Sequence, residues 1–329
     1  MSHMSQEKKT AGESAASVSK KTGRNMPQAV ATGAVLVVII LACILIRIDA
    51  FAFLIAVFMV LGLWELRVDF ATADLHIPVV ELWICSCITL IASFYASDHV
   101  AVMSAGVLAT SLVVTIASSF PHRLGGRLSR AVTAKQVAAG GPVQGIQTPE
   151  GLPGAGGRGN SFANVGVSLL TTVYIVLLAC LIVLPTTFGG HPAAHAFMVI
   201  FLPALGDIGG LFFGSWFGRH KISPKISPAK SLEGLFGSML CSLIGSLVIF
   251  ACTYPMASWG SIWWVAVLMG LMVGITGIFG DLSASMIKRD LGIKDMGHLL
   301  KGHGGVLDRV DSILMSAPFV TLLLLATGL

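Results

Sequence analysis

Long apolar segments constrain the fold of this chain more than any other feature of its sequence. Hydrophobic residues make up 55% of its 329 residues and charged residues only 11%, whereas soluble domains carry about 25% charged residues. A helix that crosses a bilayer needs about 20 mostly apolar residues. Nine segments reach or approach that length: 27–46, 50–66, 77–95, 100–119, 164–184, 193–218, 232–253, 260–280 and 312–328. The pattern predicts an all-α integral membrane protein with about nine transmembrane helices.

The lysine and arginine residues predict how these segments are oriented. Positive charge gathers in the loops on the cytoplasmic side of a membrane protein. If the N-terminus lies in the cytoplasm, Arg47 is the only lysine or arginine placed outside. Adding or removing one span destroys this separation. The sequence therefore predicts a cytoplasmic N-terminus, an outside C-terminus and a multi-pass protein of the cell membrane.

Composition divides the chain into four parts. Residues 1–25 are polar, begin with Met-Ser-His-Met, which resembles a cloning remnant, and are expected to be disordered. Residues 26–119 form a predicted four-helix membrane region. Residues 120–163 are rich in Gly, Pro and Arg and are expected to form a flexible cytoplasmic loop. Residues 164–329 form a predicted five-helix membrane region that carries two chemically dense cytoplasmic segments.

Charge and cysteine usage exclude two classes of function. The formal net charge is +5, but the cations are spread over membrane-flanking loops and form no basic stripe, so we expect no nucleic-acid partner. The six cysteines lie almost entirely in apolar runs and include no Cys-x-x-Cys pair. We interpret them as buried thiols without a disulfide or a zinc role.

The first dense segment, residues 285–311, mixes cations, acids and histidines between two apolar runs. Charge beside hydrocarbon is costly and marks a functional site by default. Asp308 and Asp311 are three residues apart and share a helix face, and Asp281 ends the preceding span. Three converging carboxylates repel one another unless a cation lies between them, and oxygen ligands near phosphate favour Mg²⁺. The alternative is an interfacial network of salt bridges.

Several neighbouring residues are suited to bind phosphate. Ser285, Lys288 and Arg289 follow Asp281 by about one and two helical turns, and His303 opens a tight glycine loop. The second dense segment, residues 207–234, leaves a membrane helix through several glycines and continues with lysines and prolines. Glycines allow close backbone approach to a ligand, and lysines offer point charges to phosphate. Helix-packing glycines followed by a positively charged inside loop explain that segment equally well.

These residues carry a resemblance to a known family. The run Ser285-x-x-Lys288-Arg289-x4-Lys294-Asp295, followed by His303-Gly304-Gly305-x-x-Asp308-Arg309-x-Asp311, resembles the signature of the phosphatidate cytidylyltransferases, also called CDP-diacylglycerol synthases. The stretch from Asp207 to Gly234 resembles a second characteristic segment of that family. Together the two segments cover about the last 125 residues. The first four spans carry no motif that matches.

The resemblance implies an enzyme that transfers the cytidylyl group of CTP to phosphatidic acid, giving CDP-diacylglycerol and pyrophosphate. Asp281, Asp308 and Asp311 would hold Mg²⁺, with a second cation left open. The implied catalytic residues are Asp281, Lys288, Asp308 and Asp311, and the implied substrate-binding residues are Asp207, Lys221, Lys230, Ser285, Arg289, Lys294, His303 and Arg309. Membrane lipids are expected partners, the active site is expected on the cytoplasmic side, and a homodimer is left open.

Two other functions compete with this one. An ion-coupled secondary transporter would also use intramembrane aspartates and glycine-broken helices, but it would place its charges near the bilayer midplane. A related membrane nucleotidyltransferase could act on a different lipid phosphate. An assay of CTP incorporation into lipid with several acceptors separates these readings.

Overall fold

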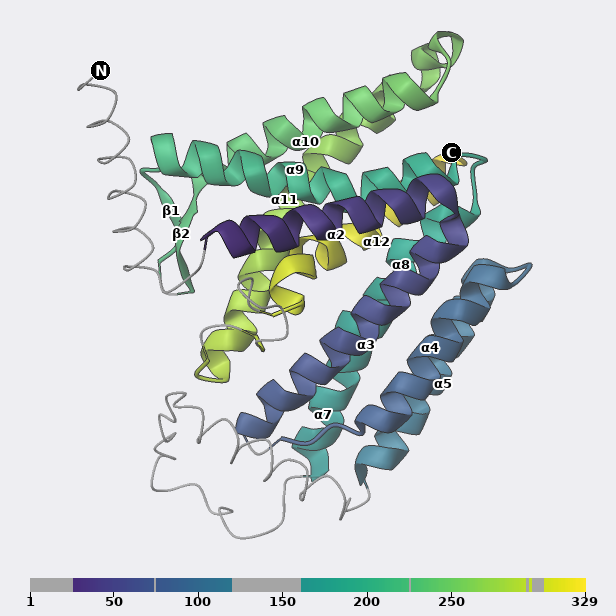
Figure 1. Cartoon of the computed structure of the whole chain (residues 1–329), viewed down its shortest axis with the longest axis vertical. Coiled ribbons are helices and arrows are strands. Elements are labelled where there is room, and N and C mark those ends of the chain that lie inside the picture. Colours follow the sequence, from purple (N-terminus) through teal and green to yellow (C-terminus); the bar gives the residue numbers. More distant parts are fainter. Residues whose placement is uncertain (1–25, 74, 120–160, 225, 294–295, 298–304) are drawn as a thin grey trace, which may run out of the picture.

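The computed structural model describes residues 26–73, 75–119, 161–224, 226–293, 296–297 and 305–329. These residues form helices and one two-stranded hairpin (Figure 1). The predicted tail 1–25 and most of the predicted loop 120–163 lie outside the described residues. The helices of the first part are α2 (Met26–Ile46), α3 (Ile48–Thr72), α4 (Val79–Tyr95) and α5 (His99–Ser119).

The second part of the chain holds the remaining elements. They are α7 (Ser161–Thr171), the π-helical turn η1 (Thr172–Leu177), α8 (Leu178–Val183), the 3₁₀ turn η2 (Leu184–Thr187), α9 (Pro192–Phe217), β1 (Lys221–Ser223), β2 (Ser227–Ser231), α10 (Leu232–Thr253), the 3₁₀ turn η3 (Met256–Ser258), α11 (Trp259–Asp290) and α12 (Leu307–Thr327).

Every predicted apolar segment lies largely within helical structure. Within the described ranges, seven helices are long and apolar enough to cross a membrane, and two shorter apolar helices cover Ala31–Ile46 and Val79–Tyr95. The prediction of an all-α membrane protein is therefore confirmed. The helices follow from the sequence because a bilayer leaves no water to satisfy backbone groups, so an apolar span must bond internally.

Small residues bring α9, α10 and α11 close together. A Cβ added at Gly209 would lie 2.4 Å from the carbonyl oxygen of Gly237, and one added at Gly274 would lie 2.5 Å from the Cα of Met239. Serine hydroxyls of α10 donate hydrogen bonds to both α9 and α11. Ser242 Oγ donates to the carbonyl of Leu202 on α9 at 3.0 Å, and Ser238 Oγ donates to the carbonyl of Gly274 on α11 at 2.9 Å. Such contacts hold membrane helices together where apolar surface gains nothing by leaving lipid.

Helix α12 joins the two parts of the chain. It packs against α11, α9 and α8. Its first residue, Leu307, lies close to α3, because a Cβ added at Gly62 would be 3.1 Å from the Leu307 side chain. Helix α2 packs against α9, and α3 packs against α8 and α4 (Figure 1). Helices α4 and α5 pack against each other, and α5 also contacts α7. Helix α3 is thus the N-terminal element placed to influence residues at the start of α12.

A short hairpin follows α9 where the sequence analysis expects a lysine-bearing loop. Strands β1 and β2 pair antiparallel, with Lys221 opposite Ser231. Ser231 caps α10, because its Oγ accepts a hydrogen bond from the Gly234 amide at 3.2 Å. Glu233 accepts hydrogen bonds from the backbone amide and the ring Nδ1 of His220, the latter at 2.7 Å. The hairpin and the helix start are thereby fixed to one another.

Candidate functional site

Helices α11 and α12 approach each other closely at Gly280. A Cβ at this position would lie 2.5 Å from the carbonyl oxygen of Asp311 and 2.9 Å from the Cα of Ser312. Only glycine allows this approach without displacing backbone. Asp281 follows Gly280 directly, so the contact brings Asp281 beside Asp311.

A group of carboxylates surrounds this contact. Asp311 is 6% exposed, and its Oδ1 accepts a hydrogen bond from the Ser312 amide at 2.7 Å. The Ser312 hydroxyl donates to Oδ1 of Asp207 on α9 at 3.1 Å. Asp281 and Asp207 are the two carboxylates that act electrostatically on Asp311. The structure thus brings together Asp207, Asp281 and Asp311, of which the sequence analysis assigned Asp207 to substrate and the other two to metal.

Asp308 lies in a different setting. Its Oδ1 accepts a hydrogen bond from Lys288 Nζ at 2.7 Å, and its Oδ2 accepts one from the Met296 amide at 3.1 Å. The pair is nearly enclosed, with side-chain exposures of 14% for Lys288 and 12% for Asp308. The carboxylate predicted to join Asp281 and Asp311 in a metal site is therefore engaged by a lysine in this state.

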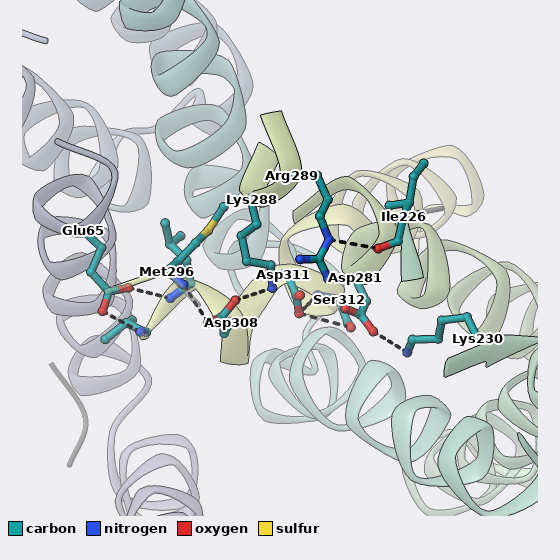
Figure 2. A network of polar contacts seen from close by, with 12 residues as sticks. Glu65, Ile226, Lys230, Asp281, Lys288, Arg289, Met296, Asp308, Asp311 and Ser312 are labelled. Atoms are coloured by element: carbon teal, nitrogen blue, oxygen red, sulfur yellow. Dashed lines mark hydrogen bonds and ion pairs between the residues drawn. The ribbon is translucent and has the colours of Figure 1, made fainter. Parts of the chain in front are cut away.

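The hairpin contributes a second lysine. Lys230 Nζ forms an ion pair with Asp281 Oδ2, and Arg289 Nε donates to the carbonyl of Ile226 at 3.5 Å. Both contacts join the second dense segment to α11. Figure 2 shows the labelled polar side chains in one band that runs from Glu65 through Asp308 and Asp311 to Lys230. The two segments that the sequence analysis singled out therefore meet in space.

The other predicted residues divide into three groups. Ser285 is buried on α11. Lys221 on β1 and Arg309 on the first turn of α12 are exposed. Lys294 and His303 lie outside the described residues, and their predicted roles remain predictions.

The donors at the contact between α11 and α12 suit a hard cation. Among the described residues, no group of three or more His, Cys, Asp or Glu side chains is arranged to hold a metal ion. The carboxylates of Asp207, Asp281 and Asp311 and the hydroxyl of Ser312 nevertheless supply oxygen donors only. Oxygen donors and buried negative charge are what Mg²⁺ prefers, while zinc favours sulfur and nitrogen. The donor chemistry fits Mg²⁺, and its binding remains a prediction.

The sequence analysis missed Glu65. This residue lies on α3, is 1% exposed, and accepts hydrogen bonds from the backbone amides of Val306 at 2.8 Å and Leu307 at 2.9 Å. Asp69, one turn later, is also buried. A signal was present, because acids within an apolar span are rare and functional by default. No family motif accompanied them in the first four spans.

Tyr174 was missed as well. It lies in the π-helical turn η1 and is buried, and its hydroxyl has no hydrogen-bond partner among the described residues. Asp311, Asp308 and Asp281 all act on it electrostatically. π-Helical turns often occur at functional sites, but no local sequence signal marks this one.

Comparison with known proteins decides the family. The family model described as "Cytidylyltransferase family" matches residues 27–327. The chain belongs to the cytidylyltransferase family. The resemblance seen in the two dense segments is thereby confirmed, and the cytidylyltransferase match extends over the first four spans, where no motif was visible.

Individual relatives agree with this assignment. This chain is 37% identical to a phosphatidate cytidylyltransferase of Mycobacterium bovis over 164 residues, which cover 50% of this chain and 52% of the relative. It is 35% identical to one from Staphylococcus haemolyticus over 166 residues, 50% of this chain and 61% of the relative. An uncharacterized protein of Escherichia coli, YnbB, is 42% identical over 153 residues, 46% of this chain and 49% of the relative. The chain thus spans about half the length of the curated relatives that it matches.

Proposed function

We propose that this cytidylyltransferase transfers the cytidylyl group of CTP to phosphatidic acid, giving CDP-diacylglycerol and pyrophosphate. The observation that carries the proposal is the meeting of the two dense segments, in which Lys230 of the hairpin pairs with Asp281 of α11. The names of the mycobacterial and staphylococcal relatives support the substrates. A site of lysines and buried carboxylates at a membrane helix end suits two phosphorylated substrates, one of them a lipid.

The chemistry needs positioning and charge neutralisation more than a base. An oxygen of the lipid phosphate would attack the α-phosphorus of CTP and form a new P–O bond. The bond from that phosphorus to the oxygen bridging to the β-phosphate would break, and pyrophosphate would leave with the electron pair. The attacking phosphate is already ionised, so no strong general base is required. Lysines held close to carboxylates in the free protein would contact phosphate oxygens when substrates bind.

Named residues would divide this work. Lys288 and Lys230 would bind phosphate charge, because each is already held at the site by an ion pair. Asp281 and Asp311 are our proposed Mg²⁺ ligands, Asp207 is an added candidate, and Asp308 would join after exchanging its contact with Lys288. When bound, Mg²⁺ would neutralise phosphate charge and orient the two substrates. A second cation remains a prediction.

An apolar cavity beside the site would hold an acyl chain of the lipid. It is lined by α2, α3, η1, α8, α9 and α12, through Ile40, Phe51, Leu54, Ile55, Phe58, Met59, Ile175, Ala179, Ile182, Ile200, Leu307, Val310, Ile313 and Leu314. Leu307 and Val310 immediately precede Asp308 and Asp311, so one face of α12 meets the cavity while another bears the carboxylates. A lipid phosphate at the carboxylates would therefore place its chain beside this cavity.

We propose nine spans, with the N-terminus in the cytoplasm and the C-terminus outside. The seven long helices and the two shorter apolar ones account for the nine predicted segments, and the positive charge is distributed as this arrangement requires. The site would then face the cytoplasm, where CTP is available, in the plasma membrane. A homodimer remains a prediction.

Labelled CTP provides the test. Purified protein in detergent–lipid micelles should transfer label from CTP into lipid when phosphatidic acid is present. Transfer to a polyprenyl phosphate but not to phosphatidic acid would favour the related nucleotidyltransferase. No incorporation into any lipid phosphate, together with ion-dependent solute uptake in proteoliposomes, would favour the transporter and overturn the proposal.

A further inference from the structure

We propose that Glu65 of α3, supported by Asp69, is a positioning residue that holds the start of α12 and thereby aligns Asp308 with Lys288. The inference rests on the proposed function for its kinetic consequences, while its structural part stands separately. It assigns a task to the N-terminal region, in which no motif was recognised.

The carboxylate of Glu65 acts as an end cap for α12 supplied by another helix. Its two oxygens each accept one backbone hydrogen bond, Oε1 from Val306 at 2.8 Å and Oε2 from Leu307 at 2.9 Å. The first amides of a helix have no partner within the helix, and Val306, which precedes Leu307, has no polar side chain to cap them. A negative charge at a helix N-terminus is further stabilised by the helix dipole.

Two glycines leave room for the Glu65 side chain. Gly297 has a φ of +63°, and a Cβ there would lie 2.7 Å from Glu65 Oε1. A Cβ on Gly305 would lie 3.1 Å from Glu65 Oε2 and 1.5 Å from the carbonyl oxygen of Met296. The carboxylate therefore lies against both glycines, where any side chain would obstruct it. The approach of Glu65 adds to the positive φ of Gly297 in favouring glycine there, while at Gly305 the carbonyl oxygen of Met296 alone already excludes a side chain.

Asp69 strengthens the same contact from the next turn of α3. Glu65 and Asp69 are four residues apart and so share a helix face. Asp69 accepts a hydrogen bond from the backbone of Gly297 and interacts electrostatically with Glu65. One acid therefore binds the start of α12, and the other binds the chain at Gly297. Helix α3 contacts the chain both before and after residues 298–304.

The contact leads directly to the proposed catalytic pair. Asp308 directly follows Leu307, whose backbone amide donates to Glu65. Oδ2 of Asp308 accepts a hydrogen bond from the Met296 amide, and Met296 precedes Gly297, which interacts with Asp69. Its other oxygen contacts Lys288 at 2.7 Å. Moving the start of α12 would therefore move Asp308 relative to Lys288. Burying two acids in an apolar span is costly, and apolar residues would serve better if this face only packed.

The test replaces Glu65 with glutamine, which keeps the size of the side chain but loses the charge and one acceptor oxygen. Misplacement of reacting groups by about 1 Å costs about a hundredfold in rate, so we expect the E65Q kcat to fall at least tenfold. The KM for CTP should change less than threefold, because the hydrogen bonds that Glu65 accepts within the described residues come from the backbone amides of Val306 and Leu307, neither of which is a proposed substrate-binding residue. E65D, which keeps the charge, should recover part of kcat. E81Q, which removes a carboxylate from α4, is the matched control and should keep wild-type kcat.

Hydrogen exchange of a peptide covering 305–312 separates this inference from the proposed function. E65Q should exchange faster there than the wild type and the E81Q control, whether or not phosphatidic acid proves to be the substrate. An inactive wild type with normal exchange protection would overturn the proposed function alone. Folded E65Q with wild-type kcat, or with unchanged exchange in 305–312, would overturn the positioning role. The positioning role would also be overturned if E65D had a kcat as low as that of E65Q and both variants unfolded at an equally reduced temperature.

Discussion

Removing the cation from the Lys288–Asp308 pair should separate its structural role from its catalytic one. In K288M, the methionine keeps much of the side-chain volume and leaves Asp308 without its partner at 2.7 Å. Side-chain exposures of 14% and 12% place the pair close to the buried limit, where breaking one partner costs about 3–5 kcal/mol. Asp308 keeps its hydrogen bond from the Met296 amide, so we expect the lower end, about 3 kcal/mol.

Thermal unfolding in detergent measures this loss, which corresponds to a decrease of about 4 °C in unfolding temperature for a chain of 329 residues. The double variant K288M/D308L removes both charges. It should regain most of that stability, because the uncompensated carboxylate is gone. Turnover of CTP with phosphatidic acid should be lost in K288M and in the double variant alike. The reasoning fails if K288M unfolds at the wild-type temperature, or if the double variant is no more stable than K288M.

Three further predictions concern the metal, the lipid and the topology. EDTA should abolish turnover and Mg²⁺ restore it, while D311N should stay inactive with Mg²⁺ present, because it loses a charged oxygen ligand; full activity in EDTA would contradict the site. I55W, which fills the apolar cavity, should raise the KM for long-chain phosphatidic acid about tenfold but leave dihexanoyl phosphatidic acid unaffected; V57W, on an exposed position of α3, is the control, and equal effects of both would argue against the cavity. In a cysteine-free background, S223C should be labelled only from the cytoplasmic side and A257C only from outside, and labelling of S223C from outside would overturn the nine-span arrangement.

Much of the fold follows from local sequence. The apolar segments could be predicted as helices because a run of about 20 apolar residues in lipid has few alternatives to a helix. Two short elements were not predicted from the sequence. The hairpin at 221–231 lies where a loop was expected, and no residue pattern predicts the π-helical turn at Thr172–Leu177. The two dense segments were visible because charge beside hydrocarbon is costly and therefore rare.

The partners within the site could not be read from the sequence. Asp281 lies on α11, and Asp308 and Asp311 lie in the first two turns of α12. Asp308 nevertheless pairs with Lys288, while Asp207, far earlier in the chain, is linked to Asp311 through Ser312. Helical spacing shows which residues share a face, but not which face a neighbouring helix presents.

Sequence alone determined the membrane class, the position of each helix and the kind of chemistry that the last part of the chain supports, because hydrophobicity and charge act residue by residue. Only the tertiary structure decided that Glu65 caps a helix that begins 242 residues later. That contact depends on how closely α3 approaches the start of α12. The approach depends on Gly297 and Gly305 leaving room for the carboxylate, and packing of this kind is a property of the assembled helices.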